Sequence, residues 1–295
     1  GNSITYDNSN RTYTLTSNFE INDNNKRYFP IPIEDGVTFD GDGKTIDISV
    51  SGWNGLFTLI STTSTITFNL ENTTINVSGE YFESNNSWFF KSNKQVDNDD
   101  GLYALNNINI NNCHTTTTSS AGINYNGGAI VGRYFGYGAT CSIYGCSNSL
   151  SVSGNNAGGI AGSHVGHGNG SVTIEYCWNT GDINSTDERK GGGGIIGSQC
   201  DNVIIKYCYN TGNILGEGVG GICGQNAISA TIFNCYNTGT NTDTNNQGGI
   251  LGYGGGDGGT HRSLQQRDRG CPAQALRPPR PHQDSIRPRL HRVLC

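Results

Sequence analysis

Methionine is absent from the 295 residues of the chain, and charged residues make up only 14% of it. The missing initiator leads us to expect a mature fragment or an excised region of a longer protein. No apolar run reaches the length of about 18 residues that a membrane-spanning helix requires, so we expect no membrane insertion in this segment. Residues 1–4 also lack the charged and then apolar profile of a signal peptide.

Helix-forming sequence is scarce as well, because 44 residues are glycine and many apolar positions hold Ile or Val. Glycine and β-branched residues are poor helix formers, so we expect an all-β protein. Ten cysteines are present, but no C-x-x-C pair suits a zinc site. We therefore expect neither a metal site nor a cofactor.

The chain contains a repeat, marked by cysteines that each close an alternating apolar strand. Five such cysteines lie 27 to 33 positions apart, and each is followed 12 to 16 residues later by a double glycine and an aliphatic residue. A period of this length predicts a solenoid, in which every repeat packs only against its neighbours. The glycine pairs begin at Gly127, Gly158, Gly193, Gly220 and Gly248.

Residues 201–224 show how one repeat can form a coil. Val203 and Ile205 alternate as a half-buried strand requires. Strict alternation would point Cys208 outward, so we expect a bend near Lys206-Tyr207 that turns it inward. Two further short strands follow between Gly and Asn turns, which predicts a parallel β-helix of about seven coils.

Stacked coils place equivalent side chains about 4.8 Å apart, one above another. The repeat cysteines then form an inward ladder: Cys113, Cys146, Cys177, Cys208 and Cys235. A second ladder follows two residues later, where an amide can donate to one coil and accept from the next: Asn148, Asn179, Asn210 and Asn237. An outward aromatic column comprises Trp178, Tyr209 and Tyr236. Its rings could stack on sugars or simply pack on an exterior strand.

The state of the cysteines is left open by the sequence. A small buried thiol suits the ladder positions, because cysteine is among the most buried residue types. Cys141, Cys200 and Cys223 fall off the ladder and are better disulfide candidates in an oxidising compartment.

Six N-x-S/T sequences are possible N-glycosylation sites if the protein is secreted by a eukaryote. They are Asn10, Asn72, Asn76, Asn85, Asn169 and Asn184.

The chain changes character near residue 261. Residues 1–260 hold four arginines and residues 261–295 hold eight, while the glycine punctuation and the alternation stop. We therefore expect three parts: an N-terminal cap over residues 1–40, solenoid repeats over 41–254, and an atypical Arg/Pro-rich tail over 255–295. The tail is interpreted as a disordered extension or as an artefact of reading frame or gene model.

Short phrases in the repeats resemble a known class of sequence. Gly-Gly-Ile-Ala-Gly at 158–162 and Tyr-Cys-Tyr-Asn-Thr-Gly-Asn-Ile at 207–214 resemble GLUG-type repeats of large cell-surface proteins, including the non-catalytic region of some bacterial IgA-cleaving metalloproteases. The segment 37–46, Val-Thr-Phe-Asp-Gly-Asp-Gly-Lys-Thr-Ile, looks like the first coil of pectate-lyase-like right-handed β-helices. Together these resemblances imply a right-handed parallel β-helix outside the cell.

Catalytic motifs are incomplete. Gly43-Lys44-Thr45 ends like a phosphate-binding loop but lacks the loop's first glycine. The triplets of polygalacturonase-like enzymes occur in the wrong order, as Asp99-Asp100, Gly166-His167-Gly168 and Asn241-Thr242-Asp243. Glycosidic cleavage needs two carboxylates at a set separation, and the central coils carry few. His164-x-x-His167 could hold a metal but is better read as an exposed loop.

We therefore expect a non-enzymatic extracellular or cell-surface β-solenoid, acting as a stalk, filament subunit or adhesin and carrying no catalytic residues. Its expected partners are other surface proteins, glycans or copies of itself, and not nucleic acid. Two alternatives stay open: a polysaccharide lyase or hydrolase, and the non-catalytic stalk of a larger surface protease.

Overall fold

The computed structural model describes residues 3–60, 64–79, 84–92, 106–185, 191–215, 218–240 and 249–252. The chain divides into two units, residues 1–265 and 266–295, and every described residue belongs to the first. The expected tail over 255–295 and the change near residue 261 lie outside the described residues.

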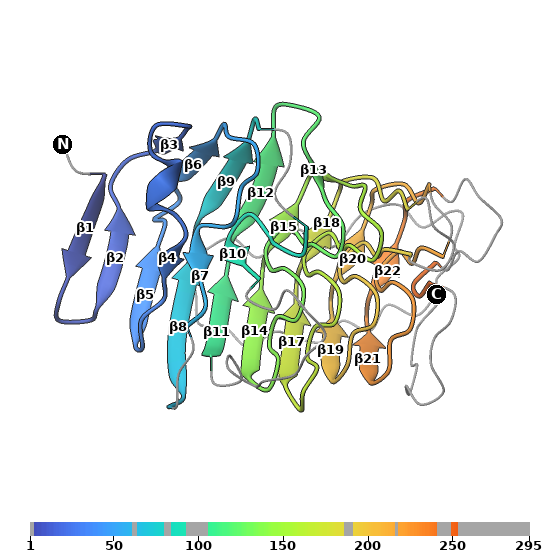
Figure 1. The fold of residues 1–295 in the computed structure, drawn as a ribbon. Coiled ribbons are helices and arrows are strands. Elements are labelled where there is room, and N and C mark those ends of the chain that lie inside the picture. Colours follow the sequence, from blue (N-terminus) through green and yellow to red (C-terminus); the bar gives the residue numbers. More distant parts are fainter. Residues whose placement is uncertain are drawn as a thin grey trace, which may run out of the picture. The chain divides into compact units, whose positions relative to one another are not determined.

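The first sheet, sheet A, has nine strands and runs along the whole described unit (Figure 1). All its neighbouring strands pair in parallel except β1 and β2, which are antiparallel. In spatial order its strands are β1 (Ile4–Asp7), β2 (Thr12–Leu15), β5 (Val37–Asp40), β8 (Ile66–Glu71), β11 (Asn106–Asn111), β14 (Thr140–Tyr144), β17 (Ser171–Glu175), β19 (Val203–Lys206) and β21 (Ala230–Phe233).

The second sheet, sheet B, has eight strands, all parallel to their neighbours. They are β3 (Phe19–Ile21), β6 (Thr45–Ile48), β9 (Thr74–Val77), β12 (His114–Thr117), β15 (Ser147–Asn148), β18 (Trp178–Asn179), β20 (Tyr209–Asn210) and β22 (Tyr236–Asn237).

A third side closes each coil. It begins as a three-stranded parallel sheet of β4 (Ile31–Pro32), β7 (Phe57–Thr58) and β10 (Phe90–Lys91). It continues through single parallel bridges that join Gly128, Gly158, Gly193 and Gly220 in turn. Three further elements are the paired strands β13 (Gly122–Ile123) and β16 (Ser151–Val152) and a 3-10 turn at Lys26–Tyr28.

The core consists of columns of inward side chains. In β8 the buried positions alternate with half-buried ones, and Phe68 and Leu70 lie in register with Ile108 and Ile110 of β11. Burying one such side chain stabilises the fold by about 1.5–3 kcal/mol. Because every coil repeats the same inward positions, each column is continuous from coil to coil.

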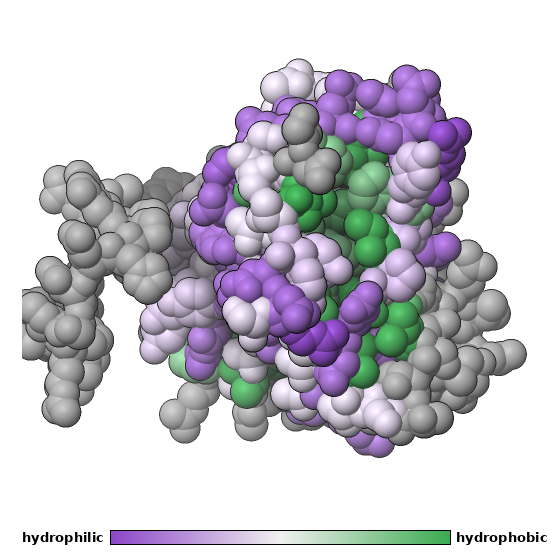
Figure 2. Space-filling view, turned by 90° about the vertical axis from the view of Figure 1, so that its left-hand side faces the viewer, coloured by the Kyte–Doolittle hydropathy of each residue, from purple (hydrophilic) through white to green (hydrophobic). Residues whose placement is uncertain are grey.

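The N-terminal end of the core is partly open. Figure 2 looks onto this end and shows hydrophobic residues in the centre of a hydrophilic rim. A cavity of about 330 Å³ lies here, lined by Ser3, Ile4, Phe19, Phe29, Ile31, Phe39 and Leu56. Of the described strands within the expected cap over residues 1–40, only β1 departs from the parallel arrangement; β3 and β4 already pair in parallel with the next coil.

The all-β class and the parallel β-solenoid are confirmed, with about six turns where about seven were expected. Among the described residues, no helix has the length and apolar character to cross a membrane.

Candidate functional site

In every repeat the chain turns from sheet A into sheet B at one residue that has a left-handed backbone conformation. These residues directly precede the ladder cysteines and have φ between 52° and 65°: Asn112, Gly145, Tyr176, Tyr207 and Asn234. The bend expected near Lys206-Tyr207 therefore lies at Tyr207. The left-handed residue breaks strict alternation, so the cysteine that follows turns inward.

The five repeat cysteines are buried and free, and they lie on the inward side of this bend. The N–H groups of Cys113, Cys146 and Cys208 each donate to the Sγ of the next cysteine in the ladder, at 3.4 Å. Each Sγ also has the carbonyl oxygen two residues before it at 3.2–3.4 Å. Burial raises the pKa of the Cys113 and Cys177 thiols, so these two thiols stay neutral.

The asparagines two residues further on form a continuous chain of amide hydrogen bonds. Asn148 Nδ2 donates to Asn179 Oδ1, Asn179 Nδ2 to Asn210 Oδ1, and Asn210 Nδ2 to Asn237 Oδ1, each at 2.7 Å. Thr115 Oγ1 starts the chain by donating to Asn148 Oδ1 at 2.8 Å. Each Nδ2 of the first three asparagines makes a second bond to a backbone carbonyl two residues on. The ladder thus satisfies the polar groups of a buried turn.

The rings of Trp178, Tyr209 and Tyr236 face each other. Their centroids are 6.1 and 5.1 Å apart, with interplanar angles of 7° and 5°. These nearly parallel rings are stacked one after another along the column. Both faces of Tyr209 are therefore covered by neighbours, and the column presents ring edges outward. This geometry favours a packing role over sugar stacking for the column.

A second aromatic group at the bend was not foreseen from the sequence. We name it the corner patch: Tyr144, Tyr176, Tyr207 and Phe233. The tyrosines are 40–41% exposed. Tyr176 and Tyr207 stack with centroids 4.9 Å apart, while Tyr144 and Phe233 meet them edge-on at 5.3 and 5.9 Å. Glu175 and Lys206, which directly precede Tyr176 and Tyr207, form an ion pair between β17 and β19.

Tyr176 and Tyr207 adopt a left-handed backbone conformation that their side chains disfavour. Left-handed φ costs roughly 1–2 kcal/mol for a residue with a side chain, and only glycine and asparagine adopt it routinely. The same corner holds Asn112, Gly145 and Asn234 in other coils. Departures from local preference of this kind concentrate at functional sites. A patch of exposed tyrosines where asparagine suffices is the strongest site signal among the described residues.

The sequons occupy different environments. Asn10, Asn169 and Asn184 are exposed, whereas Asn72, Asn76 and Asn85 are half-buried. Asn72 and Asn76 donate their amide N–H to Asp40 and Asp47, at 3.1 and 2.7 Å. Exposure therefore favours the first three as glycan acceptors.

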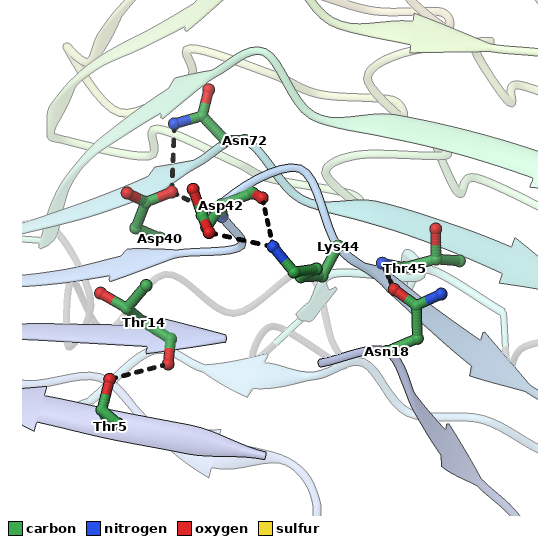
Figure 3. Close-up of polar contacts among 8 residues, drawn as sticks. All are labelled: Thr5, Thr14, Asn18, Asp40, Asp42, Lys44, Thr45 and Asn72. Atoms are coloured by element: carbon green, nitrogen blue, oxygen red, sulfur yellow. Dashed lines mark hydrogen bonds and ion pairs between the residues drawn. The ribbon is translucent and has the colours of Figure 1, made fainter. Parts of the chain in front are cut away.

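The loop that resembles a phosphate-binding motif is an ordinary turn. Figure 3 shows Lys44 Nζ turned back onto Asp42, with its carboxylate oxygen at 2.9 Å and its carbonyl at 3.1 Å. Thr45 N–H donates to Asn18 Oδ1 at 2.9 Å, on the neighbouring coil. These groups hold the first coils together.

The two histidines of the His164-x-x-His167 motif lie together, with ring centroids 5.2 Å apart. His164 Nδ1 accepts from Arg133 Nε at 3.4 Å, and His167 Nε2 is 2.6 Å from the carbonyl oxygen of Gln199. A guanidinium this close disfavours a bound cation. No group of three or more His, Cys, Asp or Glu suited to a metal occurs among the described residues.

Two carboxylates of the central coils, Glu175 and Asp182, are separately engaged. Glu175 pairs with Lys206, and Asp182 Oδ1 accepts the N–H of Asn213 at 2.9 Å. The candidate triplets at 99–100 and 241–243 lie outside the described residues.

No family model matches the chain, and no curated protein matches it. Among solved structures, the chain is similar to a crystal structure from Bacteroides ovatus that carries the name "putative immunoglobulin A1 protease". The similarity has a TM-score of 0.52 and 22% sequence identity, and it covers 82% of this chain and 77% of the other. At this identity the two chains share a fold, which is the β-solenoid.

Proposed function

We propose that this chain is a non-enzymatic structural and adhesive β-solenoid of the extracellular space or cell surface, with the corner patch as its contact surface. The observation that carries the proposal is the left-handed backbone of Tyr176 and Tyr207, which are exposed where other coils use asparagine or glycine. Tyrosine is enriched at interfaces because one end of its side chain is apolar and the other polar.

The remaining columns support the structural part of the proposal. The cysteine and asparagine ladders direct their polar groups along the stack, from one coil to the next. Side chains committed to their neighbours in this way stabilise coil stacking. Surface proteins, glycans and further copies of the chain remain the expected partners.

A second candidate function is the non-catalytic stalk of a larger surface protease. It is favoured by the fold shared with a chain whose name refers to an immunoglobulin A1 protease, and by the resemblance of the repeats to GLUG-type sequences. A stalk and an adhesive module are compatible, since both need a stable solenoid.

The double substitution Tyr176→Asn and Tyr207→Asn tests the role of the patch. Relief of left-handed strain, about 1–2 kcal/mol per residue, offsets the lost aromatic pairing of about 0.5–1.5 kcal/mol. We therefore expect an unchanged or slightly raised unfolding midpoint. Binding to immobilised polysaccharides, surface glycoproteins or the chain itself should weaken by roughly tenfold or more.

Biolayer interferometry on that panel measures the loss, with Tyr28→Asn as the matched control because Tyr28 is 66% exposed and lies outside the patch. Equal binding by the double variant and the wild type would contradict the contact role. So would a wild type that binds no member of the panel.

A further inference from the structure

Two inward columns of the solenoid each contain one cysteine, and these two cysteines lie in adjacent coils. Parallel bridges define the first column as Val131, Ala161, Ile196, Cys223 and Leu251. The second is Phe135, Val165, Cys200 and Ala227, all buried. In this second column, the residue after Val165 donates to the carbonyl of Phe135, and the residues after Cys200 and Ala227 repeat the pattern one coil on. The other coils fill both columns with apolar side chains, so the core itself does not require a thiol there.

The two cysteines meet in the core. Cys200 Sγ and Cys223 Sγ are 3.5 Å apart, and both residues are 0% exposed. Among the described residues, neither sulfur has a backbone hydrogen-bond partner. Cys141 differs, because its Sγ accepts from the N–H of Ile108 at 3.4 Å and lies 3.6 Å from the carbonyl of Asn106.

We propose that Cys200 and Cys223 are a redox modification site, which closes to a disulfide when the protein matures in an oxidising compartment. The ladder cysteines and Cys141 remain thiols, because their sulfurs are already held by backbone groups. This proposal rests on the proposed extracellular location, which supplies the oxidant, and it does not depend on the corner patch.

The oxidant is a small disulfide such as oxidised glutathione. The thiolate of one cysteine attacks a glutathione sulfur, forms a mixed disulfide and releases one glutathione thiolate. The second cysteine then attacks the protein sulfur of that mixed disulfide and releases the other glutathione. The two cysteines lose two electrons and two protons, and the protons end on the two glutathione thiols.

The geometry requires only a small movement. A disulfide places its sulfurs about 2.05 Å apart, so the sulfurs must approach by about 1.5 Å, the difference from 3.5 Å. Contact with Cys200 and burial both raise the pKa of the Cys223 thiol, and the closed core excludes the oxidant. The bond is therefore formed during folding, before these coils close.

Peptide mapping of the full chain, refolded with reduced and oxidised glutathione and alkylated before digestion, tests the proposal. Trypsin and chymotrypsin together cut after Lys206, Tyr209 and Phe233, which separates Cys200, Cys208, Cys223 and Cys235 into different peptides. We expect peptide 191–206 joined to the peptide that contains Cys223, with the sum of their masses less two hydrogen atoms. Recovery of Cys200 alkylated, or joined to another cysteine, would overturn the proposal.

Variants in which each cysteine is replaced by a residue found elsewhere in its own column provide a second test, read out by the unfolding midpoint. Cys200→Val and Cys223→Ile place there the side chains that the preceding coils already carry, Val165 and Ile196. Refolding with glutathione should raise the wild-type unfolding midpoint by roughly 5 °C or more over the reduced protein. This shift should vanish in both variants and persist in the Cys141→Val control; a shift that survives Cys200→Val would refute the pairing.

Discussion

Asn179→Asp is expected to lower the free energy of unfolding by about 4 kcal/mol or more. The substitution replaces the buried Nδ2 group, which donates two hydrogen bonds, with an oxygen atom that accepts hydrogen bonds instead of donating them. Asn179 Nδ2 donates to the carbonyl of Gly181 and to Asn210 Oδ1, both at 2.7 Å, and the residue is fully buried. A carboxylate oxygen in that place faces two other oxygens. The substitution keeps the size of the side chain, so loss of packing does not account for the effect.

The loss should also depend on pH in a defined direction. Burial raises the pKa of the introduced carboxyl group, because the charged form is poorly solvated there. The folded state then binds the proton more tightly than the unfolded state. The free energy of unfolding therefore falls as pH rises above the pKa of the carboxyl group in the unfolded state, about 3.9. Urea unfolding at two pH values measures both effects.

Asn184→Asp is the matched control, because Asn184 is exposed. Its unfolding free energy should stay within about 0.5 kcal/mol of the wild type. If the two variants unfold alike, the asparagine ladder does not hold the coils as described.

Gly193→Ala is expected to destabilise the protein by about 3 kcal/mol or more, since the added methyl group overpacks a site that is surrounded by backbone atoms. A Cβ on Gly193 would lie 2.1 Å from the carbonyl oxygen of Ile196, 2.6 Å from the N of Gly224 and 2.9 Å from the carbonyl carbon of Cys223. None of these atoms belongs to a flexible side chain. Relief would require opening the bridge between Gly193 and Gly220.

Gly249→Ala provides the comparison, because a Cβ there meets no described atom within 4 Å. Thermal unfolding of both variants should show a large drop in midpoint for Gly193→Ala and little change for Gly249→Ala. A Gly193→Ala protein as stable as the wild type would mean that adjacent coils do not approach as closely as the structure has them.

Much of the fold could be predicted from the sequence because stacking converts a repeat in the chain into a column in space. The spacing of Cys113, Cys146, Cys177, Cys208 and Cys235 sets the length of each coil. Their alternation with Ile and Val identifies the inward face, and the need to turn Cys208 inward located the bend at Tyr207. These inferences depend on one periodicity and need no knowledge of contacts between columns.

Contacts between columns could not be predicted in the same way. Tyr144 lies two residues before its cysteine and Tyr176 only one, so the corner patch joins two register positions that look unrelated in sequence. Cys200 and Cys223 likewise belong to different columns, and only the packing of the coil shows that those columns touch. The orientation of the rings in the column of Trp178 also depends on packing.

The measurement that tests the proposed non-enzymatic role most directly is a turnover assay on the full chain. The chain would be incubated with pectin, related polysaccharides and immunoglobulin A1, and products followed by reducing-end assay and mass spectrometry, with heat-unfolded chain as the control. The account predicts no product above the control for any substrate. Many product molecules per chain, lost on unfolding, would contradict it.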